Sequence, residues 1–156
     1  MKPIHEEVIE SIILSFEAEA NYLSALDQIY NQYPELKSYL DQENYTLLTN
    51  EELALLEYLV MVIIKSSEEG LGTAPKIELS KIEQYEDLNW EIVNNNNTKN
   101  FKKILDKYFE NYAQEDLLAL VEDSTETDDE TIVTTVGREI LVVACKSLID
   151  CLDDLN

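Results

Sequence analysis

The sequence of 156 residues has few of the residues that mark several protein classes. It contains three glycines, three prolines and two cysteines, which excludes collagen-like repeats, low-complexity chains and disulfide-rich scaffolds. It has 11 lysines and arginines against 33 aspartates and glutamates, so the formal net charge is −22. A protein that binds nucleic acid nonspecifically needs a cationic face to displace counterions from the phosphates. We therefore expect no direct nucleic-acid binding.

Histidine is also scarce, and this limits the enzymatic chemistry that the chain can support. The single histidine, His5, would have to serve any Ser-His-Asp or Cys-His arrangement. The glycines at positions 70 and 72 lack the rest of a phosphate-binding loop, so we expect no cofactor. Cys145 and Cys151 lie six positions apart in a predicted helix, about 9 Å along its axis, too far for a disulfide. Two reduced thiols are typical of a cytoplasmic protein.

Long apolar runs are missing as well. The most apolar window, Leu53 to Ile64, contains Glu57 and is shorter than the roughly 20 residues that a spanning helix needs. The first residues, Met1 to Glu7, lack the basic and apolar regions of a signal peptide. These observations predict a cytoplasmic protein without a membrane segment.

Apolar residues recur every three or four positions along most of the chain, which predicts helices. One such stripe predicts a single helix over residues 3–32, which ends before Pro34 because the residue before a proline avoids the α region. A short helix is expected over 34–41. Within the segment 51–69, the stretch 53–64 is apolar on almost every side, so we expect this segment to be the central helix of the core.

Three capping boxes predict where helices begin. In this motif a serine or threonine and a glutamate three positions later satisfy two free backbone N–H groups. The boxes are Thr49 to Glu52, Ser80 to Glu83 and Thr127 to Glu130. They predict a helix ending at Gly70, a helix to about residue 93 and the last helix, ending near residue 155.

The segment between the second and third boxes contains further helices. The asparagines at 94–97 predict a break, and Thr98 is expected to cap the next helix, whose inner face begins with Phe101. The apolar residues at 117–121 belong to another helix after a bend at 111–114, or to an extension of the same one. Residues 131–136 contain a β-branched run that fits a short strand as well as a helix.

The helical pattern dominates, so we predict an all-α fold. We expect residues 1–156 to form one domain, a bundle of about five to seven helices around the segment 51–69.

Carboxylates are numerous enough that metal sites have to be considered. No Glu-x-x-His pair is present for a di-iron bundle, and a calcium loop starting at Asp123 would place Asp128 where glycine and Thr134 where glutamate is required. The pairs Glu7–Glu10 and Glu83–Glu86 have the spacing of helical magnesium enzymes. We predict no particular catalytic or metal-binding residue, and keep a metal-dependent helical hydrolase of a phosphorylated small molecule as an alternative.

Two features of the composition, an excess of acidic residues near the end of the sequence and an excess of tyrosine, indicate a binding surface. Residues 110–156 hold 13 acids against two basic residues, which is half of the net charge, and the chain has nine tyrosines against three phenylalanines. Tyrosine combines a large contact area with a polar tip and is enriched at interfaces. The predicted contact residues are Glu122, Asp123, Glu126, Asp128, Asp129, Glu130, Tyr30, Tyr33 and Tyr39. Acids that serve solubility and tyrosines whose hydroxyls face water remain the plainer explanation of both features.

An acidic surface attracts a basic one and accelerates their association. The sequence therefore favours a non-enzymatic acidic protein-interaction module that binds a basic protein. An inhibitor or immunity-type protein and a nucleic-acid mimic are the two classes that fit. The alternatives are the hydrolase above and an oligomeric accessory protein whose tyrosines and apolar helices pair with another copy.

Overall fold

Eight α-helices and one 3₁₀ turn make up the part of the chain that the computed structural model describes, which is residues 1–96, 100–128 and 130–156. The elements, in chain order, are α1 Glu6–Phe16, α2 Glu19–Gln32, α3 Pro34–Leu40, the 3₁₀ turn η1 Glu43–Tyr45, α4 Asn50–Leu71, α5 Leu79–Asn94, α6 Phe101–Phe109, α7 Glu115–Ser124 and α8 Thr135–Leu155. These residues contain no strand, so the predicted all-α fold is confirmed. No helix among them is long and apolar enough to cross a membrane.

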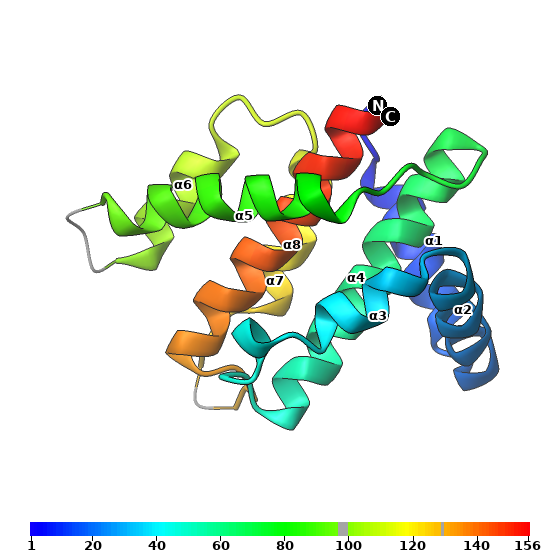
Figure 1. Cartoon of the computed structure of the whole chain (residues 1–156), viewed down its shortest axis with the longest axis horizontal. Helices are drawn as coiled ribbons and strands as arrows, with labels where there is room; N and C mark the ends of the chain where they lie inside the picture. The colour runs from blue at the N-terminus through cyan, green and yellow to red at the C-terminus, as the bar shows by residue number, and fades with distance from the viewer. Residues whose placement is uncertain (97–99, 129) are drawn as a thin grey trace.

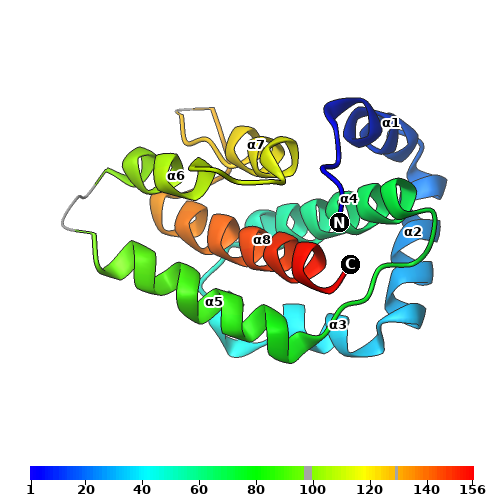
Figure 2. The ribbon, with the colours of Figure 1, turned by 90° about the horizontal axis from the view of Figure 1, so that it is seen from above.

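Two long helices, α4 and α8, form the centre of the molecule. Figure 2 shows α8 beside α4, with α5 on one side and α6 and α7 on the other. The helices α1 and α2 pack on α4, and α3 packs on α2 and α5 (Figure 1). The stretch Leu59–Ile64 is almost fully buried, which confirms the predicted central helix, and residues 140–149 of α8 are buried to the same degree. The apolar residues that all the helices bury form one core cluster.

The predicted single helix over residues 3–32 is wrong, because the chain turns at Glu17 and Ala18 between α1 and α2. Ala18 is extended, and the Asn21 side chain donates to the Ser15 carbonyl across the turn. The turn lets both halves of the apolar stripe pack on α4. Phe16 lies at this corner against the aromatic rings of α2 and α4. This break accounts for a helix count slightly above the predicted five to seven.

The observed helix ends test the capping residues that the sequence predicts. The Thr49 box is confirmed, but α4 continues through Gly70 and ends at Gly72, whose φ of 72° is the left-handed conformation that glycine adopts most easily. The Ser80 box is wrong: α5 begins one residue earlier, after Glu78, without a side-chain cap. The predicted break after α5 falls partly, and the predicted Thr98 cap wholly, on residues 97–99, which are outside the described residues.

The Thr127 box is also wrong, because residues 125–128 and 130–134 belong to the connection between α7 and α8. The last helix is capped instead by Thr134, whose hydroxyl accepts from the Gly137 N–H at 3.0 Å. Residues 131–134 belong to that connection and 135–136 to α8, so neither a strand nor a helix over the whole of 131–136 is formed. The bend at 111–114 does separate α6 from α7, and Asn111 there has a φ of 54°.

Glu52 connects the starts of the two central helices. Its Oε1 accepts from the Thr49 N–H at 2.9 Å, while its Oε2 accepts from both the N–H and the hydroxyl of Thr134 at 3.0 Å. The side chain is completely buried. One carboxylate therefore completes the N-terminal caps of α4 and α8, where the helix dipoles also favour a negative charge.

Gly137 is the position that this link makes most sensitive to substitution. A Cβ atom there would overlap the Glu52 carboxylate, so Gly137→Ala has to displace the shared cap. We expect the free energy of unfolding to fall by about 2–3 kcal/mol, the loss typical of buried hydrogen bonds to a charged group. Gly70→Ala is the matched control, because its Cβ would meet only the flexible end of Ile4. Urea unfolding of both variants measures the difference, and equal losses would contradict this role of Gly137.

The hydrogen bonds of Glu52 also make the stability of the fold depend on pH. Burial on its own raises the pKa of Glu52, but the hydrogen bonds from Thr49 and Thr134 outweigh burial and lower it below its ordinary value. A lowered pKa stabilises the fold fully above the unfolded-state pKa of about 4.3 and loses that effect as the pH falls through the folded-state pKa. The stability difference between the wild type and Glu52→Gln should therefore be constant at neutral pH and shrink between about pH 5 and 3. A difference in urea unfolding that is unchanged at about pH 3 would be evidence against it.

Candidate functional site

A hollow of about 670 Å³ lies where α5, the first half of α8 and residues 43–47 meet. We call it the α5–α8 hollow. From α5 it is lined by Glu86 and Trp90, which are four positions apart and so lie on one face of the helix. From α8 it is lined by Val136, Ile140 and Ala144, again at helical spacing, with Glu139 beside them. Glu43, Tyr45, Thr46 and Leu47 complete it.

The wall of this hollow is apolar and partly open to solvent. Leu47 is 73% exposed and Val136 60% exposed, so both leave apolar surface open to solvent at the hollow. The acids Glu43 and Glu139 lie on the same lining. Apolar surface surrounded by charged groups is the usual composition of a protein interaction site.

A buried carboxylate lies within the hollow. Glu86 is 9% exposed, and its Oε1 accepts hydrogen bonds from the hydroxyls of Tyr39 and Tyr45, the latter at 2.6 Å. Burial, together with the neighbouring phenol and the Glu86 carboxylate, raises the pKa of Tyr39 well above its ordinary value, and burial and Glu86 do the same for Tyr45. Both phenols therefore stay protonated and act as donors. Among the described residues, nothing donates a hydrogen bond to the second oxygen, Oε2.

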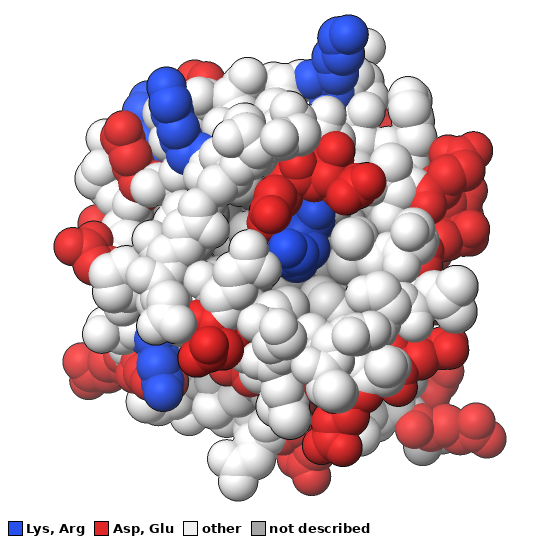
Figure 3. All heavy atoms as spheres, turned by 90° about the vertical axis from the view of Figure 1, so that its right-hand side faces the viewer, with Lys and Arg blue, Asp and Glu red and all other residues white. Residues whose placement is uncertain are grey.

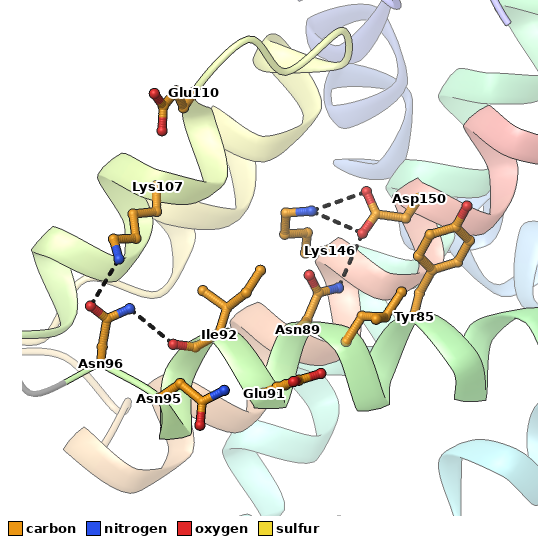
Figure 4. Close-up of a pocket in the computed structure, with 11 residues that line it drawn as sticks. Tyr85, Asn89, Glu91, Ile92, Asn95, Asn96, Lys107, Glu110, Lys146 and Asp150 are labelled. Carbon is orange, nitrogen blue, oxygen red and sulfur yellow. Dashed lines mark hydrogen bonds and ion pairs between the residues drawn. The ribbon is translucent and has the colours of Figure 1, made fainter.

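A second hollow, of about 740 Å³, lies between α5, α6 and α8 and has a different character (Figure 4). Lys146 forms an ion pair with both oxygens of Asp150 at 2.9 and 3.1 Å. The same Asp150 accepts from Asn89 at 3.0 Å and from the Tyr112 hydroxyl at 2.6 Å. The Lys146 ammonium also lies over the rings of Tyr108 and Tyr112. The charges of Lys146 and Asp150 satisfy one another, so this part of the hollow has the character of a structural network.

The predicted acidic contact residues lie elsewhere on the surface. Carboxylate oxygens of Glu122, Asp123 and Glu126, at the end of α7, lie within 4.8 Å of one another. Partial burial and the neighbouring acids raise the pKa of Glu122. Asp128 and Glu130 are exposed in the following connection, and Asp129 lies outside the described residues. None of the described acids among them lines the α5–α8 hollow.

The predicted tyrosines do not gather into one patch. The Tyr30 hydroxyl donates to Glu57 of α4, and the Tyr33 hydroxyl to the Pro75 carbonyl, both at 2.5 Å. Tyr39 is buried and does not line the α5–α8 hollow itself, but contacts its lining residues Glu86 and Tyr45. These hydroxyls connect α2 and α3 to the rest of the fold instead of facing water.

The surface charge does not mark a single site on the face over α1 and α2. Figure 3 shows the acids there as several separate groups on a largely uncharged surface, with a few basic side chains between them. In the described part of the chain, Glu122, Asp123 and Glu126 are also the one group of three or more potential ligands close enough to share a metal ion. The pairs Glu7–Glu10 and Glu83–Glu86, proposed for a magnesium enzyme, are therefore not brought together.

The sulfur and imidazole groups are equally separate. Cys145 and Cys151 are free and fully buried, and burial raises the pKa of Cys145 to about 12. The His5 side chain is 70% exposed and lies 3.9 Å from Asp116. A buried thiol and an exposed terminal imidazole cannot act as a nucleophile and its base.

The sequence did not predict the residues that make the hollow. Leu47, Trp90 and Val136 come from three separate segments, and each resembles an ordinary apolar residue of its own helix or connection. The one available signal was the single tryptophan, one turn after Glu86.

The two phenols on Glu86 can be tested by substitution. Tyr39→Phe removes a donor from a buried carboxylate, so we expect a loss of about 1–3 kcal/mol in the free energy of unfolding. Tyr22→Phe is the control: its ring packs on Phe16 and Tyr58, and its hydroxyl donates no hydrogen bond among the described residues. The control should change stability by less than about 0.5 kcal/mol. Chemical denaturation measures both, and a Tyr39→Phe variant as stable as the control would show that this hydrogen bond contributes little.

No protein-family model, curated protein or solved structure matches the chain. Its function has to be inferred from its own residues. The α5–α8 hollow is the described feature that combines exposed apolar side chains, acids on its lining and a buried carboxylate with an uncommitted oxygen.

Proposed function

We propose that the chain is a non-enzymatic acidic interaction module that binds a basic protein through the α5–α8 hollow. The observation that carries this proposal is the exposure of Leu47 and Val136 on a hollow whose charged lining residues, Glu43, Glu86 and Glu139, are all acids. An apolar centre loses water on binding and supplies affinity, while surrounding charges select the partner.

The net charge supports a basic partner over a second copy of the chain. Each copy carries −22, so two copies repel one another, whereas a cationic protein is attracted and steered toward the acids. Salt weakens such attraction, because it screens exposed charges over about 8–10 Å.

The hollow also favours one of the two functional classes that the sequence suggests for this protein. A nucleic-acid mimic relies on a surface of negative groups that replace phosphates, and it has no use for an apolar cavity. A hollow with tryptophan, valine and isoleucine in its wall suits an inserted side chain. We therefore favour an inhibitor or immunity-type protein that covers a basic protein, and the two free cysteines fit a cytoplasmic location for it.

Capture with matched variants tests the proposal. The chain is immobilised, exposed to lysate at low salt and eluted with rising salt, as wild type, as Leu47→Asp/Val136→Asp and as Leu14→Asp/Leu23→Asp. The control pair lies on α1 and α2, is 65% and 54% exposed, and adds the same two charges. We expect a basic protein that elutes with salt from the wild type and the control, and about tenfold weaker binding to the hollow variant.

Equal capture by the two double variants would refute the use of the hollow. Thermal melting of each variant confirms that the fold is intact before capture is compared. Light scattering on the wild type and on the Leu47→Asp/Val136→Asp variant tests the alternative of an oligomeric accessory protein. Dimers that form in the wild type and are lost in the variant would mean that the hollow binds another copy.

A further inference from the structure

We infer that the α5–α8 hollow receives one arginine side chain of the partner, whose guanidinium group binds Glu86. This inference rests on the proposed function and names the chemical group that the site recognises.

The first argument is the state of the Glu86 carboxylate. The side chain is nine-tenths buried, and both phenol donors, Tyr39 and Tyr45, bind its Oε1. Within the described residues Oε2 receives no hydrogen bond, although Glu86 lines the hollow. Oε2 is not among the fully buried polar atoms of the described residues that lack a partner, so it faces solvent in the hollow and is free to accept from a donor there. A ligand that enters the hollow can supply that donor.

The second argument is the charge of the lining. It contains three acids, Glu43, Glu86 and Glu139, and no lysine or arginine among the described residues. The hollow between α5, α6 and α8 is different, because there Lys146 neutralises Asp150 internally. The α5–α8 hollow therefore lacks its own counter-charge, and a cation from outside is complementary to it.

The third argument is the apolar wall. Val136, Ile140 and Ala144 present an aliphatic stripe from α8, and Trp90 lies one turn from Glu86 on α5. The methylene groups of a long basic side chain pack on such a stripe while the charged end reaches a carboxylate. An indole ring beside the site adds attraction for a cation.

Arginine fits these features better than lysine. Its guanidinium is planar and weakly hydrated, so it loses less on leaving water and stacks on aromatic rings. It also presents several N–H donors, which can reach the free oxygen of Glu86 and a second acceptor together.

Trp90 provides a direct measurement, because it is the single tryptophan of the chain. The protein is titrated with the peptide acetyl-Gly-Arg-Gly-amide while tryptophan fluorescence is recorded. Matched peptides carry citrulline, which keeps the shape of arginine without its charge, or lysine in the central position. We expect a saturable change with the arginine peptide, weaker binding of the lysine peptide and about tenfold weaker binding of the citrulline peptide.

Two variants on α5 separate a local effect from a general charge effect. Glu86→Gln removes the buried charge but keeps an oxygen for the phenols, and it should weaken arginine-peptide binding about tenfold. Glu83→Gln removes the same charge one turn earlier, where the side chain is exposed, and should change binding by less than about twofold. Circular dichroism verifies that both variants are folded.

The Leu47→Ala/Val136→Ala variant keeps the test decisive if Glu86→Gln does not fold. Both side chains are exposed, so their loss leaves the core intact but removes part of the wall, and peptide binding should weaken several-fold. Citrulline and arginine peptides that bind equally, or peptide binding unaffected by Glu86→Gln, would overturn the inference.

The outcomes for the inference and for the proposed function are distinct. Hollow-dependent capture of a protein without any binding of the arginine peptide would refute the arginine site and leave the interaction module standing. Arginine-peptide binding without hollow-dependent capture would support the site and refute the proposed function.

Discussion

Glu52 is a buried carboxylate whose two oxygens serve two different helices, and it sets how the starts of the two central helices meet. One oxygen accepts from Thr49 at the start of α4, and the other from Thr134 just before α8. The helices α1 and α2 pack on α4, and α5 and α7 pack on α8. Gly137 is a glycine because the carboxylate occupies the space where a side chain would lie. The wall of the α5–α8 hollow begins at Val136, two residues after the bond, so the same contact fixes the position of the candidate site.

Local sequence signals predicted those parts of the structure that local interactions decide. The Thr49 box and the apolar segment after it identified α4 correctly, because capping and burial act there in the same direction. The Ser80 and Thr127 boxes failed, since Ser80 lies inside the first turn of α5 and Thr127 lies in the connection between α7 and α8. The second role of Glu52 could not be read from the sequence, because its partner Thr134 is 82 positions away. The α5–α8 hollow was missed for the same reason.

The acidic composition also divides into groups with different physical roles. Glu52 caps helices, while Glu57, Glu86 and Asp150 accept hydrogen bonds from tyrosine hydroxyls. The excess of tyrosine over phenylalanine is thereby explained in part within the fold. The two hollows along α5 show the contrast most clearly: one contains a carboxylate fully paired with Lys146, the other a carboxylate with an oxygen to spare. A count of charges along the sequence cannot separate these roles.

The burial of both cysteines has a practical consequence for spectroscopy. Cys145 and Cys151 are fully buried, and burial raises the pKa of each thiol. Alkylating reagents react with accessible thiolates, so they react little with these two cysteines. A cysteine introduced on the surface would therefore be labelled in preference to the two native cysteines. A fluorophore or spin label at position 47, which is well exposed, would report on the mouth of the hollow without prior removal of the native thiols from the core.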